Sequence, residues 1–237
     1  MRPPPSRIQT VALLAGCLSS VLPCIADEPA VPPERPVMKQ LPAAAARETP
    51  PSARQLVDAR SEVRRRFREP LSHSETAAGA SLAAEVLIAA AMDEQDRGLK
   101  WAQLEEARRL GVAAGNAGVV ARATTLASAV YEFDDIDVEL RALRDIPLRG
   151  LSPPRAAAVA EAAERLATRA EADDRREIAI TAPSAVRRGL TRREIAITAQ
   201  LLAIRAWQRV GDPDAVRRAV SRHDQIELDR VRGESNR

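Results

Sequence analysis

The residue types that bind metals are few in this sequence, and they lie far apart. His73 and His223 are its two histidines, and its two cysteines, Cys17 and Cys24, stand near the amino terminus. A zinc or other transition-metal site needs several nitrogen, sulfur or carboxylate ligands that converge on one point. The sequence therefore predicts no metal centre, with His73 at a helix cap and His223 at the edge of the core.

A run of alternating carboxylates at residues 134–139 suggests a calcium-binding loop. Such a loop also carries glycine at its sixth position and glutamate at its twelfth. Counted from Asp135, the sixth position is Leu140, and the glutamate is missing. Acidic residues are also favoured in the first turn of a helix, because the helix macrodipole is positive there. We therefore interpret the run as the start of a helix.

Glycines and arginines that suggest phosphate binding lack the right context. Gly111, Gly115 and Gly118 follow no predicted strand, and no Lys-Ser or Lys-Thr pair completes a phosphate loop. We expect these glycines to let helices approach closely and to end one of them. Four clustered arginines fit a solvated helix face better than a site for phosphate or lipid head groups. They are Arg64, Arg65, Arg66 and Arg68.

No catalytic arrangement is recognisable. No serine stands in a nucleophile-elbow motif, and the sequence has neither an HExxH motif nor a paired-carboxylate pattern. Acidic residues that are distant in sequence can still converge, and a buried carboxylate cluster in a cleft would indicate an enzyme. From the sequence we predict a non-enzymatic protein with no catalytic residues and no cofactor.

The composition predicts an all-α fold. Alanine, the best helix former, makes up roughly a fifth of the chain. Aromatic residues are rare, with two Trp, one Tyr and two Phe, whereas strand-rich folds normally use more of them. We expect an array of antiparallel helical hairpins across residues 53–230, either a solenoid or an irregular bundle, with about eight or nine helices.

Capping signals mark the ends of several predicted helices. Serine, threonine and aspartate are favoured before the first turn, proline at its first position and glycine after the last turn. The predicted starts are Ser72-His73-Ser74-Glu75, Ser152-Pro153, Thr191-Arg192-Arg193-Glu194 and Asp212-Pro213, and a stop is predicted at Gly115-Asn116.

Apolar residues that recur every three or four positions predict the buried face of each helix. The predicted faces are Leu56, Ala59, Val63 and Phe67; Leu82, Val86 and Ala89; Trp101, Leu104, Ala107 and Gly111; Val119, Ala123, Leu126, Val130 and Phe133; Val159, Ala163, Leu166 and Ala170; Ile197, Leu201 and Ile204; and Val216, Ala219, His223 and Ile226. A further short helix is expected from Val138 to Ile146.

One short sequence occurs twice without change, as Arg175–Ala182 and Arg192–Ala199. The interval is shorter than that of a helical-hairpin repeat, which runs to ~34 residues. We interpret the two copies as two helix starts, preceded by Asp174 and Thr191, with Pro183 ending the first helix.

Two segments carry a resemblance to a known class of helical region. The sequence from Gln103 to Asn116, followed after a helix by Tyr131-Glu132-Phe133-Asp134, resembles a recurrent region of exported bacterial proteins. That region is similar to tetratricopeptide-type helical hairpins. The resemblance covers residues 53–145 best and continues more weakly to residue 220. In the proteins that it resembles, such a region often precedes a catalytic or carbohydrate-binding β domain.

The first 26 residues have the features of a secretory signal peptide. Arg2 and Arg7 precede an apolar stretch that is too short to span a bilayer, and small residues point to cleavage after Ala26. An uncleaved anchor or an amino-terminal core helix is the alternative. A second export signal competes: Leu14-Ala15-Gly16-Cys17 resembles a lipobox, in which Cys17 would be lipidated. Both export signals predict a location in the periplasm or cell envelope, or secretion.

The segment that follows, residues 27–52, is rich in proline and is expected to be a disordered linker. Residues 231–237 are expected to form a short tail. Removal of the leader would lower the net charge from +3 to +1 and remove both cysteines. This charge does not predict nucleic-acid binding. Membrane contact is expected only through a lipid anchor on Cys17.

These features predict an exported, non-catalytic helical-repeat protein that binds an unidentified protein partner of the envelope. The alternative is a membrane-tethered lipoprotein with a structural or carbohydrate-associated role. Sugar binding normally uses exposed aromatic rings, so the positions of Trp101 and Trp207 discriminate between the two.

Overall fold

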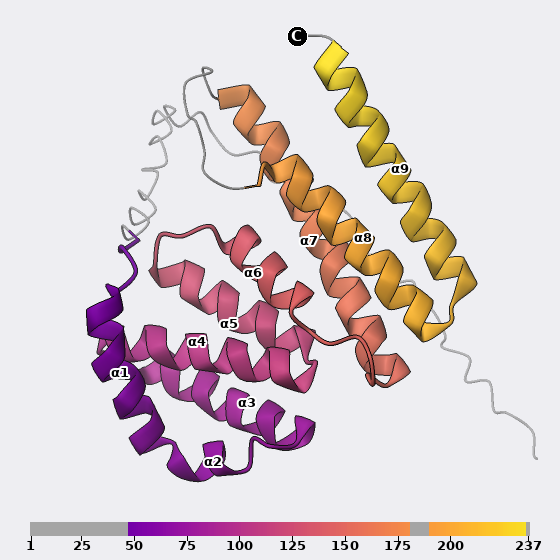
Figure 1. The fold of residues 1–237 in the computed structure, drawn as a ribbon. Coiled ribbons are helices and arrows are strands. Elements are labelled where there is room, and N and C mark those ends of the chain that lie inside the picture. The colour runs from indigo at the N-terminus through magenta and orange to yellow at the C-terminus, as the bar shows by residue number, and fades with distance from the viewer. Residues whose placement is uncertain (1–46, 181–189, 236–237) are drawn as a thin grey trace, which may run out of the picture. The chain divides into compact units, whose positions relative to one another are not determined.

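The computed structural model describes residues 47–180 and 190–235, which form nine α-helices and contain no β-strand (Figure 1). The helices are α1 (Ala53–Arg66), α2 (Arg68–Ser72), α3 (Ala77–Asp93), α4 (Arg97–Ala114), α5 (Ala117–Val130), α6 (Asp135–Arg144), α7 (Pro153–Ile180), α8 (Arg192–Val210) and α9 (Pro213–Ser235). The predicted all-α array is confirmed. The predicted signal peptide and residues 27–46 of the predicted linker lie outside the described residues, and α9 runs into the predicted tail.

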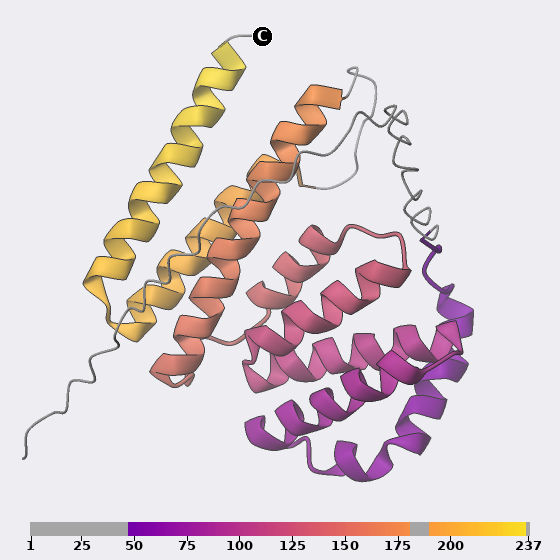
Figure 2. The ribbon, with the colours of Figure 1, turned by 180° about the vertical axis from the view of Figure 1, so that it is seen from behind.

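Helices that are adjacent in sequence pack against each other. α3, α4 and α5 lie side by side with α1 against α4, α7 and α8 form a long hairpin, and α9 packs on α8 (Figures 1 and 2). One cluster of buried residues is shared by α1, α3, α4 and α5, and a second by helices α5 to α9. α5 contributes to both clusters and so joins the two halves of the array.

An extended segment ahead of α1 is fixed to the end of α5. The amide of Glu48 donates to the Val130 carbonyl at 3.0 Å, and the amide of Glu132 donates to the Glu48 carbonyl at 2.6 Å. Glu48 and Tyr131 thereby form an isolated parallel bridge, and Arg97 makes an ion pair with the Glu48 carboxylate. Glu48, although within the predicted linker, is therefore held by the folded unit.

Most predicted helix ends lie where expected. Thr191 and Glu194 form the predicted capping box at the start of α8, with Thr191 N donating to Glu194 Oε2 at 2.7 Å. Gly115 ends α4 with a φ of 64°, a left-handed conformation that glycine adopts without a steric penalty. Pro153 and Pro213 begin α7 and α9.

The predicted helix start at Ser72 is wrong. Ser72 is the last residue of α2, and its hydroxyl donates to the Glu69 carbonyl at 2.7 Å. Thr76 caps α3 instead, because its Oγ1 accepts a hydrogen bond from the amide of Gly79 at 3.0 Å. A Cβ on Gly79 would stand 1.8 Å from the His73 carbonyl oxygen, so this close turn requires glycine.

The predicted buried faces of α3 and α8 are also wrong. Leu82 is 67% exposed and Leu201 is 40% exposed. Alanines take much of the buried face in each helix, and Ala84 and Ala203 have no exposed surface. α3 carries apolar side chains on almost every side, so its sequence does not show which face packs. In α8, Leu201 shares its face with Glu194 and Arg205, which was an available signal that this face is exposed. Alanines occupy the buried faces because their small side chains let neighbouring helices approach closely.

The first copy of the repeated sequence does not begin a helix. Residues 175–180 continue α7, which runs unbroken from Pro153 to Ile180, and residues 181–182 lie outside the described chain. Asp174, expected to cap that start, pairs with Arg193 at 3.2 Å. The second copy begins α8 as predicted.

Ala203 lies in the buried cluster of helices α5 to α9 and has no exposed surface, so added volume there should destabilise the fold. We expect Ala203→Leu to lower the free energy of unfolding by about 1–3 kcal/mol, since a close-packed core has no room for extra methylenes. Leu201→Ala, two residues away on the exposed side, should change it by less than about 0.5 kcal/mol. Urea unfolding followed by circular dichroism measures both, and an equal loss for the two variants would contradict the assignment of the buried face.

Candidate functional site

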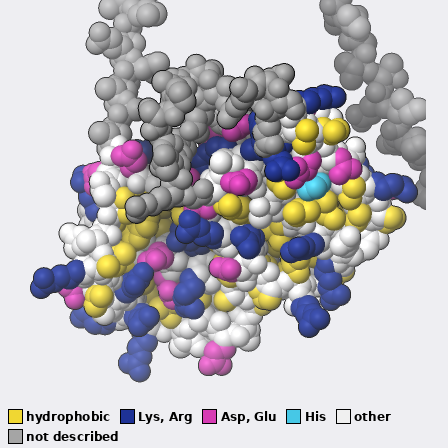
Figure 3. All heavy atoms as spheres, turned by 45° about the horizontal axis from the view of Figure 1, so that its top comes forward, with side chains coloured by type: hydrophobic (Ala, Val, Ile, Leu, Met, Phe, Trp, Pro, Cys, Tyr) yellow, Lys and Arg dark blue, Asp and Glu magenta, His cyan; other side chains and the backbone are white. Residues whose placement is uncertain are grey.

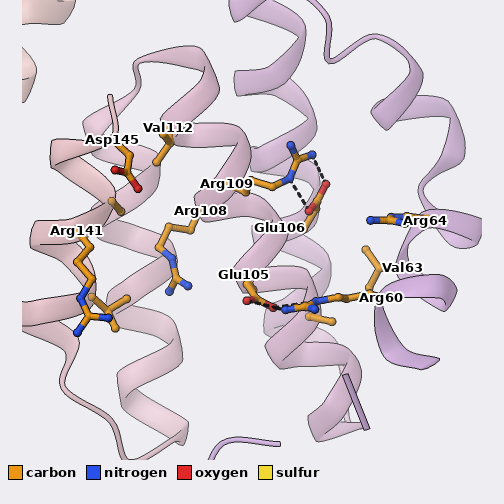
Figure 4. A pocket seen from close by; sticks show the side chains of 13 residues that line it. Arg60, Val63, Arg64, Glu105, Glu106, Arg108, Arg109, Val112, Arg141 and Asp145 are labelled. Atoms are coloured by element: carbon orange, nitrogen blue, oxygen red, sulfur yellow. Dashed lines mark hydrogen bonds and ion pairs between the residues drawn. The ribbon is translucent and has the colours of Figure 1, made fainter. Parts of the chain in front are cut away.

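A cleft of about 500 Å³ lies between α1, α4 and α6 and is lined mainly by arginines and carboxylates (Figure 4). Its charged residues are Arg60, Arg64, Arg108, Arg109, Arg141, Glu105, Glu106 and Asp145. Five guanidinium groups and three carboxylates line the cleft, and one of the arginines, Arg141, is paired with Asp137 outside the lining. The cleft therefore keeps a small excess of positive charge. Its apolar lining includes Val63, Val112 and Val138.

Two of the arginines are already held by carboxylates of α4. Arg60 reaches from α1 and donates to both oxygens of Glu105, with Nη2 2.9 Å from each. Arg109 pairs with Glu106 one turn earlier in α4, with Nε 2.9 Å from Oε2. This hydrogen bond is the main cause of a lowered pKa of Glu106, and the charges of Arg64 and Arg60 contribute. Glu105 and Glu106 are therefore both paired with arginines, and these pairs hold the side chains of the cleft wall in place.

Arg108 and Arg64 stand apart from these pairs. Arg108 is half-buried, and burial lowers its pKa below the usual arginine value although the charge of Glu105 acts in the opposite direction. Within the described residues, neither Arg108 nor Arg64 makes a hydrogen bond or close ion pair through its guanidinium. Figure 4 shows Arg108 between Glu105 and Arg141, and Arg64 reaching from α1 towards Glu106. A half-buried guanidinium with unused donors favours an anion beside it.

The other clustered arginines of α1 have a different role. Arg65 and Arg66 both hydrogen-bond to Glu62, with Nε to carboxylate distances of 2.9 Å and 2.6 Å. These bonds lower the pKa of Glu62 to about 2. Of the four arginines that the sequence grouped together, Arg64 alone lines the cleft. These arginines are therefore neighbours in the sequence, but their side chains point in different directions.

The acidic run at residues 134–139 starts α6 and pairs with arginines of other helices. Asp134 caps α6 by accepting from the amide of Asp137 at 3.0 Å. Arg169 of α7 lies 2.5 Å from Asp135 and 2.7 Å from Glu139, and Arg192 of α8 lies 2.6 Å from Asp134. These carboxylates therefore join α6 to α7 and α8. No group of acidic, histidine or cysteine side chains suited to a metal ion occurs within the described residues.

The buried carboxylate of Glu139 makes a pH-dependent contribution to stability. Burial raises its pKa above the ordinary value of 4.5, although Arg169 acts in the opposite direction. The folded protein then holds this proton to a higher pH than the unfolded chain does. Its contribution is therefore complete below 4.5 and declines as pH rises through the folded pKa.

We expect Glu139→Gln, which cannot ionise, to become more stable relative to wild type as pH rises through this range. Urea unfolding at pH values on both sides of 4.5 measures the difference. A difference that is independent of pH would contradict a raised pKa. Glu62→Gln is the control, because the pKa of Glu62 is shifted in the opposite direction.

The remaining candidate residues of the sequence do not meet at a common site. His73 lies in the turn after α2, whereas His223 is partly buried on α9, with Nδ1 3.4 Å from Asp224 Oδ1. Gly111 brings α4 and α5 together, because a Cβ there would lie 2.8 Å from a methyl group of Val119. The expectation of close helix approach at Gly111 is confirmed. Cys17 and Ala26, the lipidation and cleavage candidates, lie outside the described residues.

The two tryptophans belong to different clusters and share no surface. Trp101 meets Tyr131 and Phe133 edge-on, with ring centroids 4.9 Å and 5.3 Å apart and interplanar angles of 84° and 87°. Trp207 is partly buried against the core of α5–α9, where its Nε1 donates to Glu164 at 2.8 Å. Both rings are thus partly buried, and they lie in separate clusters.

Sequence reasoning missed the cleft because its side chains come from three helices. Arg60 and Glu105 are 45 residues apart. The four-residue spacing of Arg60 and Arg64 was an available signal, since it places both on one face of α1.

None of the described helices is long and apolar enough to cross a membrane. Comparisons with known protein families, with curated proteins and with solved structures find no match to this chain.

Proposed function

We propose that this protein is an exported, non-catalytic helical scaffold that binds an acidic segment of another protein in the cleft between α1, α4 and α6. The observation that carries the proposal is Arg108, half-buried in the cleft with no hydrogen-bond partner for its guanidinium within the described residues. One carboxylate of the partner would use these donors, and a second would use those of Arg64 on the other side of the cleft. Guanidinium and carboxylate groups match in geometry and can form two parallel hydrogen bonds.

The composition of the cleft favours a peptide over a polyphosphate or nucleic acid. Glu105, Glu106 and Asp145 in the lining would repel a ligand with many closely spaced negative charges. Val112 and Val138 offer apolar surface for an aliphatic side chain. A segment with one or two carboxylates beside an aliphatic residue satisfies both features.

The side chains of the cleft support the proposed non-catalytic role. Two of its carboxylates, Glu105 and Glu106, are paired with arginines, and the pKa of Glu106 is lowered, so it stays ionised at neutral pH. A carboxylate that serves as a general acid needs a raised pKa. The cleft is therefore better suited to holding an anion than to transferring a proton.

The proposed location is the periplasm or the cell envelope, on the basis of the predicted leader. Mass spectrometry of the mature amino terminus from the native cell tests this. A chain that begins at Asp27 supports cleavage after Ala26, and a lipidated Cys17 supports the tethered alternative. A chain that keeps its leader unmodified contradicts both forms of export.

Site-specific photo-crosslinking tests partner binding. A photoreactive residue at Val138 lines the cleft, and the same residue at Leu82, exposed on α3, is the matched control. We expect Val138 to crosslink reproducibly to an acidic segment of one envelope protein, and Leu82 not to do so. No crosslinked protein from Val138, or the same proteins from both positions, would contradict the proposal.

A further inference from the structure

The outward side of α9 carries a row of exposed residues with helical spacing. α9 packs on α8 and buries Ala215, Ala219 and Ile226. Arg217, Val220, Asp224 and Leu228 follow one another at intervals of three or four residues, so they lie on one face of the helix. Val220 is 38% exposed and Leu228 is 52% exposed. We call these four residues the α9 row.

A further apolar side chain, Leu201, is 40% exposed on α8. The side-chain amide of the neighbouring Gln200 donates to the Ala219 carbonyl at 3.0 Å, on the face of α9 that packs against α8. Figure 3 shows hydrophobic side chains gathered over α8 and α9 with charged side chains around them. Leu82 on α3, by comparison, is a single exposed leucine on a helix whose neighbouring exposed positions are alanines.

We propose that the α9 row is covered by a second copy of this chain, in an antiparallel α9–α9 contact with a two-fold axis beside Val220. The charges on this face are complementary between two antiparallel copies. Arg217 precedes Val220 by three residues and Asp224 follows it by four. An antiparallel pairing about Val220 places Arg217 of each copy opposite Asp224 of the other, so two equivalent ion pairs flank an apolar centre.

This pairing is compatible with the contacts that the row already makes. Arg217 pairs with Asp214 within its own turn, and both side chains are largely exposed. Such exposed pairs contribute little to stability, so Arg217 can exchange this partner at small cost. The Asp224 carboxylate is also exposed, with His223 Nδ1 3.4 Å from it. The inference concerns α9 alone and does not depend on the cleft between α1, α4 and α6.

Charge reversal on the full-length chain tests the pairing. Analytical ultracentrifugation of wild type across a dilution series should show a monomer–dimer equilibrium. Arg217→Asp and Asp224→Arg should each raise the dimer dissociation constant about tenfold or more, because each replaces two attractive pairs by repulsive ones. The double variant restores opposite charges and should return the constant close to that of wild type. Circular dichroism checks that every variant keeps its helix content.

A crosslink at the axis gives an independent measurement. In a chain with Cys17→Ser and Cys24→Ser, Val220→Cys should form a disulfide-linked dimer on mild oxidation, because the two copies of this position meet at the axis. Leu82→Cys is the control and should not, although it is more exposed. A chain that stays monomeric at every concentration overturns the proposal, and so does a double variant that dimerises no better than the single variants. In either case the α9 row would be left to a different partner.

Discussion

Arg108→Glu should weaken binding of an acidic peptide about tenfold or more, since it puts a negative charge beside the ligand carboxylate in a half-buried cleft. A suitable probe is a blocked tripeptide of glutamate, leucine and glutamate, which supplies two carboxylates and one aliphatic side chain. Chemical-shift changes during a titration of the labelled protein report both the affinity and the residues that contact the probe. We expect the shifts of wild type to centre on α1, α4 and α6.

The control for this prediction must change the net charge equally. Arg205→Glu does so on α8, where Arg205 is exposed and distant in sequence from the cleft helices. We expect it to leave the affinity within about twofold of wild type, because Arg205 does not line the cleft and the charge of an exposed side chain is screened by salt. Equal weakening by both variants would show that the probe responds to overall charge, and the assignment of Arg108 would then be wrong.

Tyr131→Ala should lower the free energy of unfolding by about 3–5 kcal/mol, the loss typical of a buried aromatic ring replaced by alanine. The ring of Tyr131 is buried against Trp101, Leu104 and Ala127. Its hydroxyl donates to the Arg97 carbonyl at the first turn of α4. Burial raises the pKa of Tyr131 to about 12, so this hydroxyl stays protonated at neutral pH.

Tyr131→Phe separates the ring from its hydroxyl. It keeps the ring and leaves the Arg97 carbonyl without this donor, so we expect a loss of about 0.5–1.5 kcal/mol. Thermal and urea unfolding compare the two variants. If the phenylalanine variant lost as much as the alanine variant, the hydrogen bond and not the packing would dominate, contrary to the prediction.

The sequence predicted the fold where single residues have strong conformational preferences. Gly115 ends α4 and the Thr191–Glu194 box starts α8, because a left-handed turn and a cap each need particular side chains. The buried face of α3 could not be predicted in the same way. Apolarity marks a face only against a polar background, and alanine at Ala84 gives little contrast with Leu82.

The cleft was harder to predict from the sequence than the buried faces of the helices. Arg108 follows Ala107, a residue of the predicted buried face, and nothing local distinguishes it from the exposed Arg109. Its environment depends on Arg141 of α6 and Arg64 of α1 lining the same cleft. That convergence is set by how α1 and α6 pack on α4, and helical periodicity within one segment contains no information about it.

The short bridge at Glu48 determines where mechanical load enters the folded unit. Tension on the chain ahead of Arg47 is borne first by the two backbone hydrogen bonds that join Glu48 to Val130 and Glu132, and by its ion pair with Arg97. The pull is thus transmitted to the end of α5 and to the first turn of α4, while α1 is shielded from being peeled away. If the amino terminus is fixed to a surface, this attachment point protects the wall of the cleft that α1 provides.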